Sequence, residues 1–188
     1  MRTVYAARRS EADAVLRQKQ GKVFTNRADG RKARFGRNGR EKMLSNKAVE
    51  KSKANGFTAA QHNIAAANID VLYEGASIYS SGADKQGMPD VRIYRYSVPV
   101  SFGGTEAEAR ILVKETLSNG EPDGIYTVEL SELRKPSDDS LRDRGSADIT
   151  PDATVEGSVI ILPSSKQDVN RESERSMEVT ERQETLVR

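Results

Sequence analysis

The chain has 188 residues, enough for one domain with tails. With 36% hydrophobic and 31% charged residues, 5% aromatic residues and no Trp, its composition lies between that of a compact domain and that of a partly disordered chain. The absence of Cys excludes disulfides, Cys-ligated metal sites and thiol catalysis, and the single histidine, His62, excludes sites that need two imidazoles.

No membrane segment or secretory signal is expected. The sequence contains no run of 18 or more apolar residues, and its opening, MRTVYAARRSEADAV, lacks the continuous apolar stretch of a signal peptide. We therefore expect no membrane partner.

The net charge of +2 hides a strong asymmetry. Residues 1–60 hold 16 basic and 5 acidic residues, whereas residues 61–188 hold 14 basic and 23 acidic residues. A basic front can bind a polyanion through counterion release, but an acidic tail can compete for it. The ordinary alternative is a solvated basic helix with an acidic disordered tail.

The first 56 residues predict two helices around a hairpin. Residues 10–20 begin with Ser10 as an N-cap and end at Gly21, which predicts a short helix. In residues 22–36, an Asp29-Gly30 turn between two extended pieces predicts a hairpin. Residues 39–54 carry a thin apolar stripe and end at Asn55-Gly56, so they predict a second helix.

The segment 58–75 predicts the strongest helix, capped by Thr58 and ended by Gly75. One face of this helix is expected to pack against a core, and it carries Ile64, Ala65, Asn68, Val71 and Leu72. Residues 76–90 contain two Gly, a Pro and no period, which predicts a loop.

The β-branched and aromatic segments 91–101, 108–117 and 125–130 predict three consecutive antiparallel strands. Alternation puts an apolar set on one sheet face: Tyr94, Tyr96, Val98, Val100, Ile111, Val113, Tyr126, Val128 and Leu130. The opposite face then collects Arg95, Ser97, Arg110, Lys114, Thr116, Thr127 and Glu129.

From residue 137 onward the chain has no aromatic residue and 12 acids against 7 bases. We expect residues 137–156 to be a linker or a long loop. Residues 158–162 could form a further strand of the sheet. Residues 166–188 are expected to be disordered or to form a charged helix that needs a partner.

The predicted class is α+β, with N-terminal helices on one face of a three- to four-stranded antiparallel sheet and a flexible acidic C-terminal tail. Three regions are expected: a basic arm (1–37), an α+β domain (38–135) and an acidic linker and tail (136–188).

The run NGFTAAQHNIAAANIDVLYEGA, followed by VRIYRYSVPVSFGG, ARILVKET and GIYTVELSEL, resembles a large polyvalent protein-associated domain of phages and mobile elements. That family is assigned to the ribonuclease-like superfamily of barnase, EndoU, colicin-type and RelE-type toxins. The resemblance spans roughly residues 38–135. It implies a four-stranded antiparallel sheet, a metal-independent nuclease, and a protein of the host cytoplasm or a phage particle.

Metal-free RNA cleavage needs a base, an acid and cations. On a helical wheel His62 lies beside the buried stripe, so it could face a cleft edge; the alternative is that it is a surface or boundary residue. Arg95, Lys114 and Thr116 can hold a phosphate on the polar sheet face while Glu129 acts as base. The alternative is that this sheet face is simply exposed to water. The helix that carries His62 is expected on the other side of the sheet, so His62 could join these residues only around a sheet edge.

The basic N-terminal segment is a candidate nucleic-acid surface that follows a phosphate backbone through seven cations: Arg27, Arg31, Lys32, Arg34, Arg37, Arg40 and Lys42. Phe24 and Phe35 can stack on bases or form local core. RNA is favoured over DNA as the partner, and the tail can bind a protein partner.

No cofactor is expected, because the phosphate-binding patterns GxGxxG and GxxxxGK[ST] are absent. Two classes of function remain open. One is a metal-independent ribonuclease acting as a toxin or defence effector, and the other is a non-catalytic phage protein that binds nucleic acid or serves assembly.

Overall fold

The computed structural model describes residues 3–83, 90–118, 121–136 and 160–162. Its elements follow in the order α1 (Arg9–Lys19), β1 (Val23–Thr25), β2 (Lys32–Arg34), α2 (Arg37–Met43), α3 (Asn46–Ala54), α4 (Ala59–Ala67), α5 (Ile69–Glu74), β3 (Ser77–Ala83), β4 (Val91–Phe102), β5 (Thr105–Ser118), β6 (Glu121–Arg134) and β7 (Ile160–Leu162).

The strands form one mixed sheet in the order β1-β2-β6-β5-β4-β3. The long strands β4, β5 and β6 pair antiparallel, as the alternation predicts. Strand β2 joins β6 in parallel, and β7 pairs in parallel with Val100–Phe102 of β4, beyond the stretch that β3 occupies. The sheet is therefore larger than the three to four strands expected, because the hairpin, β3 and β7 all add to it.

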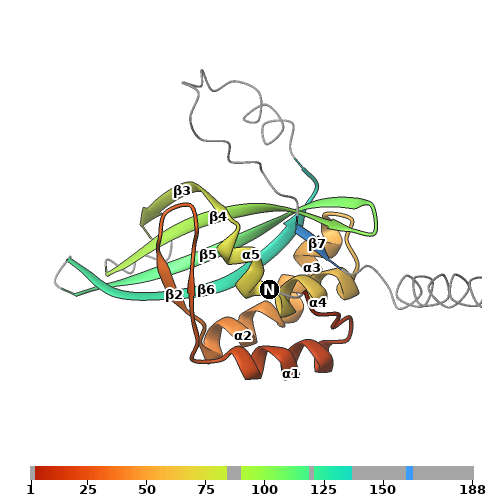
Figure 1. The fold of residues 1–188 in the computed structure, drawn as a ribbon, viewed down its shortest axis with the longest axis horizontal. Helices are drawn as coiled ribbons and strands as arrows, with labels where there is room; N and C mark the ends of the chain where they lie inside the picture. The colour runs from red at the N-terminus through yellow and green to blue at the C-terminus, as the bar shows by residue number, and fades with distance from the viewer. Residues whose placement is uncertain (1–2, 84–89, 119–120, 137–159, 163–188) are drawn as a thin grey trace, which may run out of the picture.

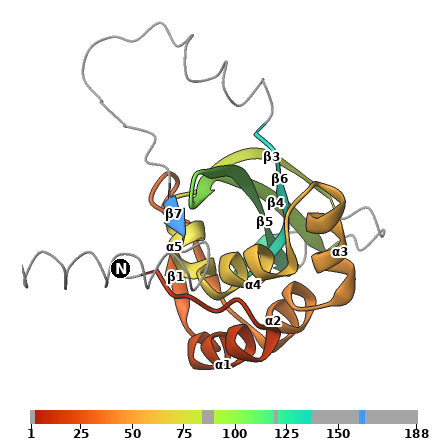
Figure 2. The same ribbon diagram turned by 90° about the vertical axis from the view of Figure 1, so that its right-hand side faces the viewer.

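All the described helices lie on one side of the sheet, in the α+β arrangement that the sequence predicts. The sheet arches over α4 and α5, and α1 packs against α4 on the side away from the sheet (Figures 1 and 2). Helices α2 and α3 pack along β6. The opposite face of β4, β5 and β6 is called the outer face below.

The core forms between α4 and the apolar sheet face. Seven side chains on that face are at most 1% exposed: Tyr96, Val98, Val100, Ile111, Val113, Val128 and Leu130. Helix α4 presents small residues, Ala65–Ala67, that are also fully buried and let the helix approach the strands closely. Burial of each large apolar side chain contributes about 1.5–3 kcal/mol relative to its exposure.

Two helices that the sequence predicts as continuous are each broken by a polar residue. Asn68 ends α4, and its side-chain amide donates to the carbonyls of Ile64 (2.7 Å) and Val4 (2.8 Å). Ser45 separates α2 from α3, and its hydroxyl caps α3 by accepting from the N–H of Ala48. In both cases a local side-chain hydrogen bond competes with the helical backbone bonds.

The predicted hairpin is confirmed, with Thr25 paired to Lys32 and Gly30 at a φ of +70°. It is held to the core by Asn26, which is 0% exposed. The Asn26 amide donates to the carbonyls of Tyr73 (2.6 Å) and Ala76 (2.7 Å) at the end of α5. The hairpin is therefore part of the same packed unit as the helices.

The prediction of a loop over 76–90 is wrong for its first half, because Ser77–Ala83 forms β3. This strand lies at the sheet edge with almost every side chain exposed, so its sequence needs no apolar alternation. Strand β7 falls within the 158–162 segment left open for an extra strand. The expectations for 137–156 and 166–188 fall outside the described residues.

Candidate nucleic-acid interface

A row of polar side chains crosses the outer face from β2 to β5. Arg34 of β2 pairs with Thr127 of β6, and Thr127 pairs with Lys114 of β5. Side chains that oppose each other on paired strands point to the same face, and neighbouring strands lie about 4.8 Å apart. Arg34, Thr127 and Lys114 therefore line up on one surface, with Arg34 and Thr127 exposed.

The next row of the same face carries the predicted base. Arg95 of β4 and Glu129 of β6 both pair with Leu112 of β5, which lies between them. Since alternate residues of a strand are roughly 6.7 Å apart, Lys114 lies within about 8 Å of each by backbone position. The structure thus brings Arg95, Lys114 and Glu129 together, as alternation predicts. Thr116 is exposed one row further, opposite Val91.

Helix α2 brings a further cation to this face around the edge of β6. The Lys42 ammonium lies 3.3 Å from a Glu129 carboxylate oxygen. Helix α2 can lie this close because of Gly39, where an added Cβ would be 2.7 Å from the carbonyl oxygen of Val128. The carboxylate is 15% exposed and Lys42 is 54% exposed, so the ion pair borders solvent.

His62 does not join these residues. The expectation that it lies at a cleft edge is wrong, because its side chain is 0% exposed in the core. Its Nδ1 lies 2.8 Å from the hydroxyl of Ser52, and its Nε2 lies 2.8 Å from the carbonyl oxygen of Met43. Burial lowers the pKa of His62, partly opposed by the hydrogen bond to Met43.

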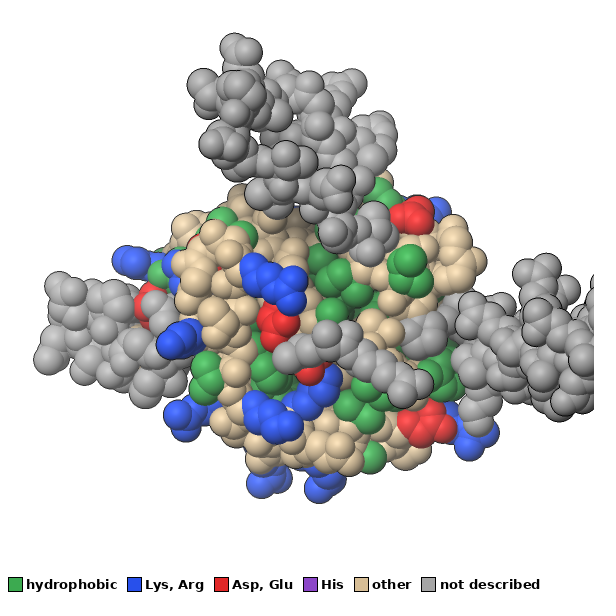
Figure 3. Space-filling view, viewed as in Figure 1, with side chains coloured by type: hydrophobic (Ala, Val, Ile, Leu, Met, Phe, Trp, Pro, Cys, Tyr) green, Lys and Arg blue, Asp and Glu red, His purple; other side chains and the backbone are tan. Residues whose placement is uncertain are grey.

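The seven cations of the predicted basic surface divide into two groups. Arg31 and Arg40 are mostly buried, with Arg40 bound to Asp13 at 2.5 Å. The other five are exposed: Arg27, Lys32, Arg34, Arg37 and Lys42. Lys and Arg side chains also project around the lower rim in Figure 3, over α1 and α2.

Arg31 has a structural position at the end of the hairpin. Its guanidinium lies 3.9 Å from the ring centroid of Tyr94, is bound to Asp29 at 2.6 Å and donates to the hydroxyl of Tyr96. Tyr96 donates in turn to Asp29 at 2.7 Å. Burial, with the hydrogen bond to Asp29, raises the pKa of Tyr96 to about 12, and burial also raises the pKa of Tyr73, which packs edge-on against it.

Phe24 and Phe35 form local core. They are 5% and 0% exposed, and their rings stack on each other with centroids 6.2 Å apart. The expectation that they stack on bases is therefore wrong, and the structural alternative holds.

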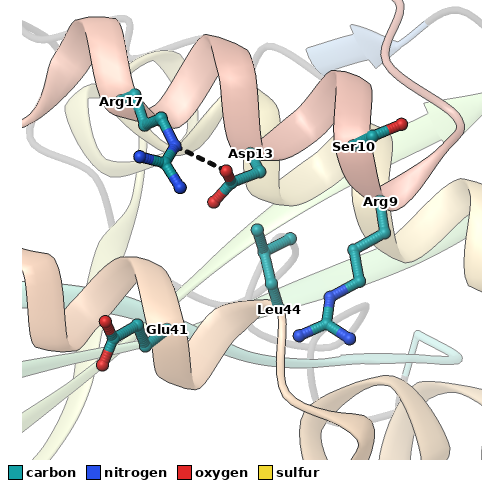
Figure 4. A pocket seen from close by; sticks show the side chains of 6 residues that line it. All are labelled: Arg9, Ser10, Asp13, Arg17, Glu41 and Leu44. Carbon is teal, nitrogen blue, oxygen red and sulfur yellow. Dashed lines mark hydrogen bonds and ion pairs between the residues drawn. The ribbon is translucent and has the colours of Figure 1, made fainter.

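A shallow hollow of about 560 Å³ lies between α1 and α2. Its lining residues are Arg9, Ser10, Asp13, Arg17, Glu41 and Leu44. Arg17 points to Asp13 across one turn of α1, at 2.6 Å, and Arg9 points toward Leu44 (Figure 4). Both carboxylates of the hollow are paired to arginines, Asp13 to Arg17 and Glu41 to Arg37.

Among the described residues, no three His, Asp or Glu side chains gather in a way that could hold a metal ion. None of the described helices is long and apolar enough to cross a membrane.

Sequence reasoning missed two features of the outer face. The alignment of Arg34 with Lys114 depends on parallel pairing between strands about 90 residues apart, for which no local pattern exists. The ion pair between Lys42 and Glu129 depends on where α2 packs. A glycine inside a short basic helix, Gly39, is the one signal that indicates close packing there.

Comparison with known proteins supports the resemblance seen in the sequence. No curated protein and no solved structure matched the chain. The family model of large polyvalent protein-associated domain 3 matches residues 3–126, which include every element from α1 to β5 and the first residues of β6. Since this match covers about two thirds of the sequence, the chain belongs to the large polyvalent protein-associated domain 3 family.

Proposed function

We propose that the outer face binds RNA and cleaves it by acid–base chemistry without a metal ion. The observation that carries the proposal is the strand register, which puts Arg34, Lys114 and Arg95 on one surface beside the Glu129 carboxylate. Long cationic side chains that share one face of a rigid sheet suit a phosphodiester, and hydroxyls such as that of Thr127 add hydrogen bonds. Assignment to the ribonuclease-like superfamily is part of this proposal.

In the proposed reaction Glu129 takes the proton from a ribose 2′-hydroxyl. The 2′-oxygen then attacks phosphorus, the bond from phosphorus to the 5′ oxygen breaks, and the Lys114 ammonium gives a proton to the leaving oxygen. Arg95 and Arg34 neutralise the charge on the phosphorane, and Thr116 is placed to bind the next phosphate. The products are a 2′,3′-cyclic phosphate and a 5′-hydroxyl.

Binding without cleavage is the second candidate. The observation that favours it is the use of His62 in the core, which leaves lysines as the acids nearest to Glu129. In this case the same surface holds nucleic acid for packaging or assembly. Family membership supports a mobile-element setting for either function, in the host cytoplasm or in a phage particle.

The test is incubation of the purified full chain with end-labelled RNA in EDTA. Glu129→Gln and Lys114→Ala are each expected to slow cleavage by about 100-fold or more, the scale for losing an acid–base group or an electrostatic stabiliser. Glu106→Gln and Lys47→Ala, which change exposed residues outside the two rows, serve as matched controls and should keep the full rate.

Two results would contradict cleavage by these residues: a requirement for magnesium, or full activity in both test variants. Retention of RNA binding with no cyclic phosphate product would instead establish the non-catalytic candidate. If the wild-type protein does not bind RNA at low salt, both candidate functions are overturned.

A further inference from the structure

An exposed tyrosine is stacked on an arginine at the β3 edge of the outer face. The Arg110 guanidinium carbon lies 4.2 Å from the ring centroid of Tyr79, which is 50% exposed. Tyr79 falls at a bulge where the pairing of β3 with β4 shifts between Ile78 and Ser80. Because β4 separates β3 from β5, the ring must cross β4 to reach Arg110, and the small Ser97, which opposes Arg110, gives it room.

The arrangement leaves one face of the Tyr79 ring available. The Arg110 side chain is only 13% exposed and is bound to Glu108 at 2.9 Å. Arg110 therefore lies beneath the ring, and the exposed half of Tyr79 faces solvent. Bases of single strands stack on exposed aromatic rings, and arginines add cation–π attraction at such sites.

A basic hollow of about 520 Å³ adjoins the same arginine. It is lined by Ala54, Asn55, Gly56, Arg110, Arg134 and Lys135. Arg134 pairs with Glu108 in the register of the outer face, and its nearest carboxylate, on Glu132, is 3.7 Å away. In the part of the chain that the structure describes, Lys135 has no carboxylate partner within 4.0 Å.

We propose that Tyr79 and this hollow form a subsite for one nucleotide of single-stranded RNA. The base stacks on the exposed face of Tyr79, and a phosphate binds in the hollow between Arg134 and Lys135. A base paired inside a duplex is not free to stack on a side chain, so the subsite selects single strands. This inference rests on the proposed function, because it extends the same outer face beyond Arg95 and Lys114.

The first measurement uses tryptophan fluorescence, since the chain has no Trp of its own. In Tyr79→Trp, a single-stranded 12-nucleotide RNA with 2′-O-methyl groups, which block cleavage, is expected to quench emission by stacking. Ile78→Trp is the matched control, because Ile78 is 44% exposed but opposes Tyr96 of the core face. Neither the control with the same RNA nor Tyr79→Trp with a blunt duplex should show this quenching.

The second measurement is affinity for the same RNA. Tyr79→Leu is expected to weaken single-strand binding by about 5- to 150-fold, the range for losing one base–aromatic stack, with duplex binding unchanged. Tyr79→Phe keeps the ring and should bind like wild type. Replacing Arg134 and Lys135 by Ala should reduce the salt dependence of binding by about one phosphate contact.

These outcomes separate the two proposals. If Lys114→Ala weakens RNA binding but Tyr79→Leu does not, and Tyr79→Trp is not quenched, the subsite is refuted while the proposed function stands. If Tyr79→Trp is quenched and Tyr79→Leu weakens binding, but Lys114→Ala and Glu129→Gln bind and cleave like wild type, the subsite is supported and the proposed catalytic residues are refuted. Equal weakening of duplex and single-strand binding by Tyr79→Leu would also refute the subsite.

Discussion

The imidazole of His62 and the hydroxyl of Ser52 form a hydrogen bond in the core, and the carbonyl of Met43 determines the tautomer of the ring. That carbonyl can only accept, so Nε2 carries the ring proton and donates it to Met43. Nδ1 is then the acceptor for the proton of the Ser52 hydroxyl, whose oxygen accepts from the backbone N–H of Leu133 at 2.9 Å. The neutral ring joins α4 to α2, α3 and β6.

The first prediction follows from this neutral ring. Burial lowers the pKa of His62 in the folded state, whereas the pKa of a histidine in the unfolded chain is about 6.5. Below that pH the unfolded state binds the proton first, so the free energy of unfolding should fall, by up to about 1.4 kcal/mol per pH unit, as pH drops from 6.5 toward the folded pKa. Chemical denaturation at pH 7 and pH 5 measures the loss.

The control for this prediction is His62→Gln, which removes the titrating group. The variant should be less stable at neutral pH, because hydrogen bonds to Ser52 and Met43 are lost or distorted. Its stability should nevertheless depend less steeply on pH between 7 and 5. An unchanged slope would show that other groups cause the dependence.

The second prediction concerns Gly39→Ala. The added methyl group would be 2.7 Å from the carbonyl oxygen of Val128, so α2 must move away from β6. Overpacking of this kind costs about 1–3 kcal/mol. Gly82→Ala is the matched control, because nothing lies within 4 Å of a Cβ there, and it should change the free energy of unfolding by at most about 0.5 kcal/mol. Equal thermal melts for both variants would contradict the packing argument.

Local signals in the sequence predicted much of this fold. The Asp29-Gly30 turn, the Thr58 cap and the alternation along β4 each depend on neighbours within a few residues, and the structure has all three. Strand β3 has almost no buried side chain and forms by pairing with β4, and the break at Asn68 includes a hydrogen bond to Val4, 64 residues away. The periodicity of apolar residues does not identify such partners.

The same distinction holds for the candidate site. Alternation with a period of two correctly put Arg95, Lys114 and Glu129 on one face. Charge counts cannot show that Arg40 is bound to Asp13, or that His62 is enclosed, because both depend on how the helices pack. A run of basic residues therefore overstates the surface available to a polyanion.

The third prediction concerns alkaline pH. The pKa of Tyr96 is raised to about 12 in the folded state, mainly by burial, whereas that of an unfolded tyrosine is about 10. The folded state thus favours the neutral phenol, and stability should fall as pH rises above about 10. Ultraviolet titration should show delayed ionisation of one or more tyrosines, and Tyr96→Phe should lose part of this pH dependence.

The fourth prediction concerns polyanion binding by the hairpin. Lys32 and Arg34 are exposed on the outer side of β2, while Ala33 between them is buried. Reversing both charges, in Lys32→Glu with Arg34→Glu, is expected to abolish RNA binding near 50 mM salt without lowering thermal stability. Wild type should bind with a steep salt dependence, with a slope of about −0.7 per phosphate contact for single strands.

The matched control for this variant is Lys51→Glu with Lys53→Glu, which reverses two charges on exposed residues of α3 away from the two outer-face rows. Its net charge equals that of the test variant, so long-range attraction falls equally in both. If β2 contacts RNA directly, only the hairpin variant should lose binding, and the salt dependence of its remaining affinity should be less steep. Equal losses in the two variants would mean that the basic N-terminal half attracts RNA through its net charge, with no defined path along β2.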